Sequence, residues 1–150
     1  GEKGKYLGQV ETAGKINIAW EVLTDYDNFE RFLPNLASSK IISAKGDRIL
    51  FEQVNVVDLW LFKQKFTVQI EAIKIKPNKI DFKIVDGDLK KLVGRWQIKE
   101  TSPGKILVSQ AVEVEPENNT DKPLFYGTYE SSLEENLKAI AKEITKRSQV

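Results

Sequence analysis

The sequence predicts an α+β protein in which one curved antiparallel sheet of about seven strands surrounds a long C-terminal helix, with two short helices after the first strand. Three observations predict this arrangement. Apolar residues recur at every second position between residues 36 and 116, and tight turns separate the runs. After residue 120 they recur at spacings of three and four. A shorter stretch with helical spacing lies near the N-terminus.

The N-terminal part predicts one short strand and two short helices. Residues 6–12 alternate in part and indicate a strand. The first helix has an apolar face formed by Ile16, Ala19, Trp20 and Leu23. It ends near Asp25–Asn28, because Asp and Asn favour helix ends over helix interiors. Phe29, Phe32 and Leu33 then form a second short apolar face before Pro34.

The middle of the chain predicts six consecutive antiparallel strands. They are expected over residues 36–45, 48–58, 62–71, 80–85, 92–98 and 106–114. The alternation slips at Ala72-Ile73, which predicts a bulge or twist there. In the strand 48–58 both alternate sets contain polar residues, so the pattern leaves its buried face open.

The C-terminal part predicts the longest helix of the chain. Its apolar stripe consists of Tyr126, Tyr129, Leu133, Leu137, Ile140 and Ile144. Pro123 suits the first turn of such a helix. Gly127 disfavours a helix interior, and Ser131-Ser132-Leu133-Glu134 fits a capping box. A start or kink near these residues is therefore the alternative.

The composition excludes several classes of protein. The 150 residues fit one domain, residues 1–150, and the balance of 23 basic and 22 acidic residues argues against nucleic-acid binding. The chain has no Cys and no His, which excludes disulfides, Cys/His zinc sites and a Ser-His-Asp triad. No apolar run is long enough to span a membrane, and a cytoplasmic location is expected. The chain also lacks Met, including an initiator Met, so the sequence leaves open whether an N-terminal segment was removed.

The predicted layout implies an internal space. The apolar stripe of one helix must cover one face of a large twisted sheet, and curvature of the sheet around that helix leaves volume unfilled. We expect the unfilled volume toward the helix end at which the two short helices lie. The sequence therefore predicts an apolar pocket.

Several strings resemble one known family over nearly the whole chain. They are AWEVLTDYDNFERFLPNL (19–36), FEQV (51–54), VDGDLKKLVGRWQI (85–98) and the terminal amphipathic helix. Together they resemble the polyketide cyclase/dehydrase and coenzyme-Q-binding branch of the helix-grip (START-like, SRPBCC) superfamily. The resemblance implies a sheet that grips the C-terminal helix around a cavity for aromatic polyketides, quinones or lipids. Cyclases of this family place polar side chains in the cavity, whereas its quinone-binding members act as carriers or chaperones.

Thirteen side chains are candidates for the cavity wall. They are Phe29, Phe32, Leu33, Gln53, Phe62, Gln64, Phe66, Phe82, Trp96, Gln110, Tyr126, Tyr129 and Leu133. Gln64 and Gln110 interrupt apolar faces, so each amide is expected to bond a neighbour, a water or a ligand oxygen. Trp96 beside Gly94 leaves room for a flat ligand, or else marks close packing of helix on strand. No catalytic residue, metal or cofactor is predicted.

The short aromatic segment with Phe29, Phe32 and Leu33 has two interpretations. It is either a mobile lid over an apolar entrance or a plain cap on the sheet, and we favour the lid. Asp25 is interpreted as a helix-end residue and not as a catalytic acid. Tyr126 and Tyr129 either turn a hydroxyl toward the cavity mouth or belong to the core.

Three functions remain in competition. The first is binding, with transport or chaperoning, of a hydrophobic small molecule such as a prenylquinone, polyketide or lipid. The second is an aromatase/cyclase, which needs acid and base groups that neutral Gln cannot supply. The third is a protein-interaction module with a vestigial cavity, which a large exposed apolar patch would indicate. The expected partner is a hydrophobic ligand and not nucleic acid, and transient membrane contact is compatible with such a cargo.

Overall fold

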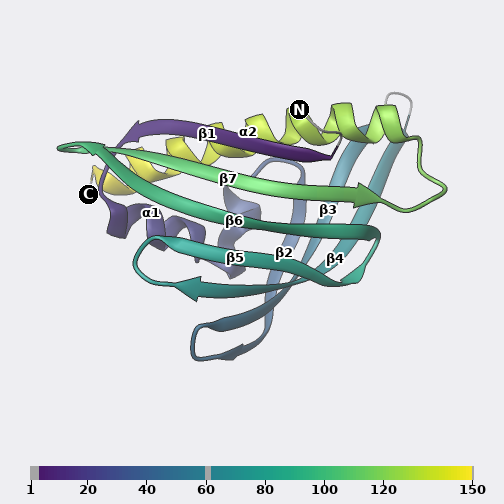
Figure 1. Cartoon of the computed structure of the whole chain (residues 1–150), viewed down its shortest axis with the longest axis horizontal. Helices are drawn as coiled ribbons and strands as arrows, with labels where there is room; N and C mark the ends of the chain where they lie inside the picture. The colour runs from purple at the N-terminus through teal and green to yellow at the C-terminus, as the bar shows by residue number, and fades with distance from the viewer. Residues whose placement is uncertain (1–3, 60–61, 150) are drawn as a thin grey trace.

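The structure is a computed structural model that describes residues 4–59 and 62–149, with side chains over the same ranges except at positions 58, 59 and 62. The described residues form the following elements, most of which Figure 1 labels. They are β1 (Lys5–Ala13), α1 (Ile16–Leu23), η1 (Tyr26–Arg31), β2 (Leu36–Lys45), β3 (Arg48–Leu59), β4 (Phe62–Ile75), β5 (Lys79–Gly87), β6 (Leu89–Ser102), β7 (Lys105–Pro116) and α2 (Lys122–Ser148). The predicted α+β arrangement is confirmed.

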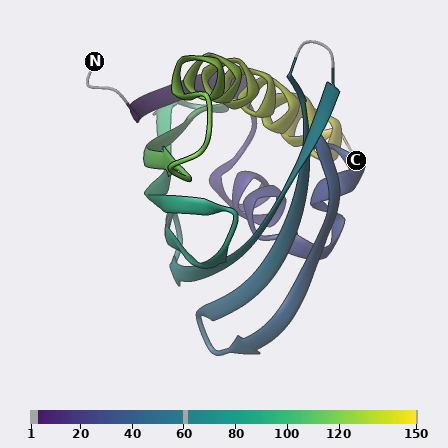
Figure 2. The ribbon, with the colours of Figure 1, turned by 90° about the vertical axis from the view of Figure 1, so that its right-hand side faces the viewer.

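The strands form one antiparallel sheet in the order β1-β7-β6-β5-β4-β3-β2. Consecutive strands are neighbours from β2 to β7, and β1 joins the sheet beside β7. Figure 2 shows the strands curving from one wall to the other, with α2 across the open side. The helix α1 lies inside this curve, and η1 lies beside the edge strand β2.

Side chains alternate between the interior and the outer surface along β4. Phe66, Val68, Ile70 and Ala72 are all buried, because the period of two continues past the middle of the strand. The predicted slip at Ala72-Ile73 is therefore wrong. The register irregularity instead lies where Gln69 and Ile70 pair with β5, which leaves Val85 as the extra residue of that strand.

The structure decides which face of β3 is buried. Ile49 and Phe51 are 4% and 5% exposed, and the same face continues through Gln53, Asn55 and Val57. The sequence pattern could not identify this face, because both alternate sets of residues in the strand contain polar side chains. Two amide side chains of β3 thus share a face with its largest buried ring.

The helix α2 begins before the glycine that the sequence marked as a break. The Asp121 carboxylate caps it by accepting a hydrogen bond from the Leu124 backbone N–H at 3.1 Å. Pro123 occupies the first turn, where its missing N–H leaves no helical bond unmade. The alternative start near Gly127 or Ser131 is therefore wrong.

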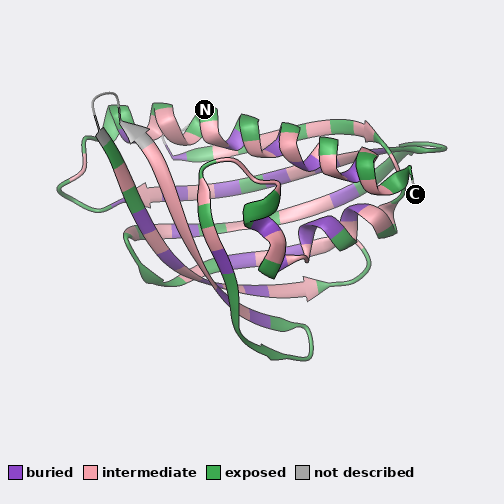
Figure 3. Cartoon of the chain, turned by 180° about the vertical axis from the view of Figure 1, so that it is seen from behind, coloured by how far each residue is buried: buried purple, intermediate pink, exposed green. Residues whose placement is uncertain are grey.

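One side of α2 packs onto the sheet and onto α1. Leu133, Leu137, Ile140 and Ile144 are buried, and Figure 3 shows the exposed residues of α2 on its outer side. The helix approaches β1 closely at Gly8, where an added Cβ would lie 2.6 Å from Leu137 Cδ1. A larger residue at this position would require the Leu137 side chain to move.

The short helix η1 is tied to the edge strand β2. The Glu30 carboxylate accepts a hydrogen bond from the Ser39 backbone N–H at 3.0 Å, and Asp27 accepts one from the Ile41 N–H at 2.8 Å. These carboxylates satisfy backbone donors that an edge strand otherwise leaves unpaired. They also hold Tyr26 and Phe29 of η1 against the interior, where both are buried.

Candidate functional site

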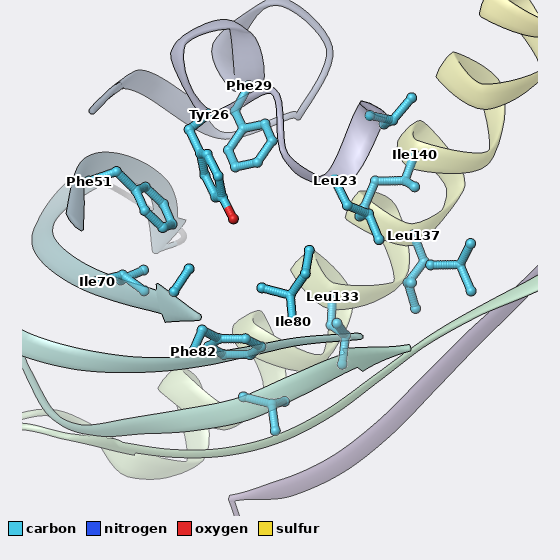
Figure 4. Packing of buried hydrophobic residues seen from close by; sticks show 14 of the residues in the cluster. Leu23, Tyr26, Phe29, Phe51, Ile70, Ile80, Phe82, Leu133, Leu137 and Ile140 are labelled. Atoms are coloured by element: carbon cyan, nitrogen blue, oxygen red, sulfur yellow. The ribbon is translucent and has the colours of Figure 1, made fainter. Parts of the chain in front are cut away.

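The sheet, α2, α1 and η1 enclose a cavity of about 420 Å³. This volume falls in the usual range of small-molecule pockets, roughly 300–1,000 Å³. Its wall includes Val22 and Leu23 of α1, Ile70 of β4, Ile80 of β5 and Ile140 of α2. Figure 4 shows buried side chains from these elements converging from opposite sides. The space is a consequence of sheet curvature, because one helix does not fill the concave side.

Four aromatic side chains form the wall at the η1 end. The Tyr26 ring packs against Phe51 with centroids 4.6 Å apart and against Phe29 at 5.2 Å. Phe29 in turn makes edge contacts with Phe51 at 6.2 Å and with Phe32 at 5.9 Å. Such tilted and edge-on geometry is favourable for aromatic pairs. The four rings therefore hold one another in place around this part of the cavity.

A second aromatic group lies at the start of α2. Phe125 is stacked on Tyr129 at 6.0 Å and meets Phe66 of β4 edge-on at the same centroid distance. Tyr129 also contacts Tyr6 of β1, with centroids 5.7 Å apart. Phe66, Phe125 and Tyr129 all line the cavity. Rings thus bound the space at two places, with aliphatic side chains between them.

Neutral amides provide much of the polar surface of the cavity. Gln53 and Asn55 extend from β3, Gln64 from β4 and Gln110 from β7. Gln110 is only 9% exposed and lies opposite Trp96 in the antiparallel register of β6 and β7. Amides supply both donors and acceptors without charge. The wall is therefore suited to uncharged oxygen groups on an otherwise apolar molecule.

Charge is nearly absent from the cavity wall. Among the described lining residues the only ionisable carboxyl is that of Asp121, which is exposed at the α2 N-terminus, and none is Lys or Arg. No group of three or more Asp or Glu residues in the described ranges is arranged to hold a metal ion. A buried charged group of a ligand would therefore lack a counter-charge, which is costly.

Two tyrosine hydroxyls of the wall stay protonated at neutral pH. Burial raises the pKa of Tyr26, because the phenolate would lose its hydration. Burial also raises the pKa of Tyr129, and the nearby Tyr6 adds to the shift. Both side chains act as neutral hydrogen-bond donors or acceptors and not as bases.

Three buried polar atoms have no hydrogen-bond partner among the described residues. They are Tyr26 Oη, Ser39 Oγ and Asn136 Oδ1. Tyr26 and Asn136 belong to the cavity wall, whereas Ser39 of β2 does not. An unpartnered buried polar group costs about 1–3 kcal/mol. Such a cost at two points of one cavity indicates that something else satisfies these atoms.

Exposed residues mark the entrance of the cavity. Asn35, Asn119, Asp121 and Leu124 are exposed yet line it. A groove along α2 from Pro123 to Glu135, bounded on the other side by Asn35 and Val57, shares five lining residues with the cavity. The Asn35 amide donates a hydrogen bond to the Glu135 carboxylate across this groove at 3.4 Å. Entry between α2 and the loop before β2 follows from this arrangement.

The aromatic segment is anchored from outside by Arg147 at the end of α2. Its guanidinium donates hydrogen bonds at 2.8 Å to Asp25, which precedes η1, and at 2.8 Å to Glu143. A longer bond of 3.3 Å reaches Glu21 of α1. The same guanidinium lies 5.5 Å from the centroid of the Phe32 ring. Asp25 is thus a helix-end residue engaged with Arg147, and a mobile lid would have to break these contacts.

Most of the predicted wall residues come together in space. Those that line the cavity are Phe29, Phe32, Leu33, Gln53, Gln64, Phe66, Phe82, Trp96, Gln110, Tyr129 and Leu133. The side chain of Phe62 lies outside the described residues. Tyr126 does not line the cavity, because its ring lies over Gly4, beside β1, and packs edge-on against Phe125.

The predicted space beside Gly94 is filled by the protein itself. A Cβ added at Gly94 would lie 2.6 Å from Phe82 Cζ and 2.4 Å from the Ala111 carbonyl oxygen. The flat group in front of Gly94 is therefore the Phe82 ring, and the close packing is between strands and not between helix and strand. Trp96 still lines the cavity two residues further along β6.

Several wall residues had no clear signal in the sequence. Tyr26 lies among residues that were interpreted as the end of a helix. Asn136 lies in a helix whose buried side was assigned from its apolar residues alone. Phe51 and Phe125 are large apolar residues that the sequence pattern did not predict to line the cavity. The helix spacing of Asn136, three residues after Leu133, was the one available clue to its orientation.

The curved seven-stranded sheet, the long helix gripped by it and the cavity between them define a helix-grip fold. The family model described as polyketide cyclase/dehydrase and lipid transport matches residues 15–139. The chain belongs to this family, and the resemblance expected from the sequence is confirmed. No curated protein sequence matches the chain.

Solved structures share the fold at low sequence identity. The Zhui aromatase/cyclase from Streptomyces sp. R1128 has a TM-score of 0.84 and 12% identity, covering 95% of this chain and 94% of that chain. A START superfamily protein from Mycobacterium smegmatis has a TM-score of 0.81 and 16% identity, covering 95% and 98%. A conserved protein from Geobacillus kaustophilus has a TM-score of 0.77 and 17% identity, covering 95% of each chain. Within the described ranges, no helix has the length and apolar character needed to cross a bilayer.

Proposed function

We propose that the protein binds a hydrophobic small molecule in its internal cavity and carries or protects it. The observation that carries this proposal is the 420 Å³ space bounded by aromatic and aliphatic side chains, most of them buried or half-buried. Burial of an apolar ligand there is favourable by roughly 25 cal/mol for each Å² removed from water. Prenylquinones, polyketides and other lipids all fit this chemistry.

The wall supports binding more than catalysis. An aromatase/cyclase needs a group that takes a proton from its substrate. The amides of Gln53, Gln64 and Gln110 cannot do so, and burial keeps the hydroxyls of Tyr26 and Tyr129 protonated. Asp121 is exposed and already caps α2. The family includes cyclases, so turnover of a polyketide remains the competing function.

Native mass spectrometry of protein purified from its own source tests the binding proposal directly. We expect a stoichiometric apolar compound to leave the protein on extraction with organic solvent. Re-addition of the extract at 100 times its dissociation constant stabilises the protein by about 2.7 kcal/mol. For a chain of this length that is a rise in melting temperature of roughly 5–10 °C. A protein that retains nothing and is not stabilised by apolar extracts would contradict the proposal.

A pair of tryptophan substitutions on α2 tests the location. Ser132 is half-buried and lines the cavity, whereas Glu134 is exposed and lines neither the cavity nor the groove. We expect Ser132→Trp to fill part of the space and weaken binding of the extracted compound at least tenfold. Glu134→Trp adds the same ring outside and should leave the dissociation constant unchanged. Equal effects of the two variants would place binding elsewhere.

A further inference from the structure

One hydroxyl group inside the cavity has no protein partner. Tyr26 is 4% exposed, and its Oη makes no hydrogen bond with any described residue. Figure 4 shows its ring beside Phe29 and Phe51, with the oxygen directed away from η1 into the interior, toward the side on which Ile80 lies. The contacts of the ring with Phe29 and Phe51 hold the phenol in this direction. The hydroxyl is thus presented to whatever occupies the space.

A second polar atom of the same wall is also unpartnered. Asn136 Oδ1 is buried without a hydrogen bond to any described residue. The residue stands on α2 between Leu133 and Ile140, which are buried wall residues themselves. An amide oxygen in apolar surroundings needs a donor. The unpartnered buried side-chain atoms of the described wall are therefore one hydroxyl on η1 and one amide oxygen on α2.

The two atoms together select the chemistry of a ligand. A hydroxyl group of a ligand can serve either atom, because it can accept a hydrogen bond from Tyr26 Oη or donate one to Asn136 Oδ1. A ketone, quinone or ether oxygen satisfies only the first, and a hydrocarbon satisfies neither. A carboxylate or phosphate would meet the Asn136 oxygen as a second acceptor and would find no Lys or Arg among the described wall residues.

We infer that the ligand is an uncharged alcohol or phenol on an apolar body. Its hydroxyl group binds inside the cavity, at Tyr26 and Asn136, and does not remain in solvent at the mouth. This inference rests on the proposed function and narrows it. The raised pKa of Tyr26 agrees, because the hydroxyl keeps the proton that it donates.

Three matched probes test the inference by calorimetry and thermal denaturation. They are 4-pentylphenol, pentylbenzene and 4-pentylbenzoate, which differ only in the group at one ring position. In the wild-type protein we expect the phenol to bind at least tenfold more tightly than the benzoate. Tyr26→Phe should weaken the phenol about 3- to 10-fold, the value of one neutral hydrogen bond, and leave pentylbenzene unchanged within about twofold. Asn136→Leu should act in the same direction.

Tyr6→Phe is the matched control. Tyr6 also loses a hydroxyl, but that hydroxyl lies outside the cavity and donates to the Tyr126 backbone carbonyl at 3.5 Å. We expect no change in the affinity for any probe. In the absence of ligand, Tyr26→Phe should not lower the melting temperature, because it removes an atom with no partner.

The outcomes separate this inference from the proposed function. If the phenol and pentylbenzene bind, but the phenol is insensitive to Tyr26→Phe and Asn136→Leu, the hydroxyl site is wrong and binding of apolar molecules stands. Tighter binding of the benzoate than of the phenol would also overturn the inference. If no probe binds or raises the melting temperature, the proposed function itself fails.

Discussion

Adding one methyl group at Gly94 should destabilise the protein measurably. The Cβ of Gly94→Ala would lie 2.4 Å from the Ala111 carbonyl oxygen and 2.6 Å from Phe82 Cζ. Distances below 3.0 Å between such atoms are not tolerated, so β7 or the Phe82 ring must move. The Ala111 carbonyl belongs to β7, which is paired with β6 along its length. The Phe82 ring is 8% exposed and lies within the core. Neither neighbour yields easily.

The magnitude follows from two opposing effects. Overpacking of this kind costs about 1–3 kcal/mol. Replacement of glycine by alanine offsets about 0.4–1 kcal/mol of this, because the unfolded chain loses freedom. At the midpoints of these two ranges the free energy of unfolding falls by about 1.3 kcal/mol, and the melting temperature falls by roughly 3–5 °C.

Gly127→Ala provides the matched control for this experiment. Gly127 lies inside α2, and a Cβ there would meet nothing within 4 Å. Alanine is favoured over glycine in a helix by about 1 kcal/mol, so the same substitution should stabilise the protein here. Urea denaturation of both variants measures the two changes. A Gly94→Ala variant as stable as the wild type would refute the packing of Phe82 against β6.

Two further predictions concern charged side chains. Arg147→Met should lower the free energy of unfolding by about 1–3 kcal/mol, because three carboxylates lose their cation at a site where the Arg147 side chain is 20% exposed. Arg48→Met is the control, because it breaks an ion pair with Glu71 in which the arginine side chain is 62% exposed. It should lower the free energy of unfolding by less than about 1 kcal/mol in the same urea titration. Equal losses of stability in the two variants would contradict the anchoring role of Arg147. The Arg95 guanidinium donates two hydrogen bonds to Asp81 and thereby lowers the pKa of that carboxyl. Because the folded-state pKa is the lower one, the stabilisation is present above the ordinary Asp pKa of about 3.9 and is lost as the pH falls through the folded value. NMR titration of the Asp81 carboxyl should show its pKa rising in Arg95→Met, and an unchanged value would exclude this pair as the cause.

Local patterns in the sequence determined the elements and the class of the protein. The period of two between residues 36 and 116 and the helical spacing after residue 120 each depend on neighbours a few residues apart, and burial of one face is what creates them. The strands at 36–45 and 48–59 and the helix at 16–23 accordingly lie where the pattern predicted them. A sheet with one covering helix also implied an unfilled interior before any coordinate was known.

Only the tertiary structure decided the orientation of several side chains at that interior. The buried face of β3 depends on its register with β4, because a shift of one residue would turn Gln53 and Asn55 outward. The Phe82 ring fills the space at Gly94 because the register of β5 and β6 puts these residues opposite each other. Tyr26 points inward because the 3-10 turn places it between Phe29 and Phe51. Apart from the contact between Tyr26 and Phe29, these contacts join residues distant in the chain, and no local spacing encodes them.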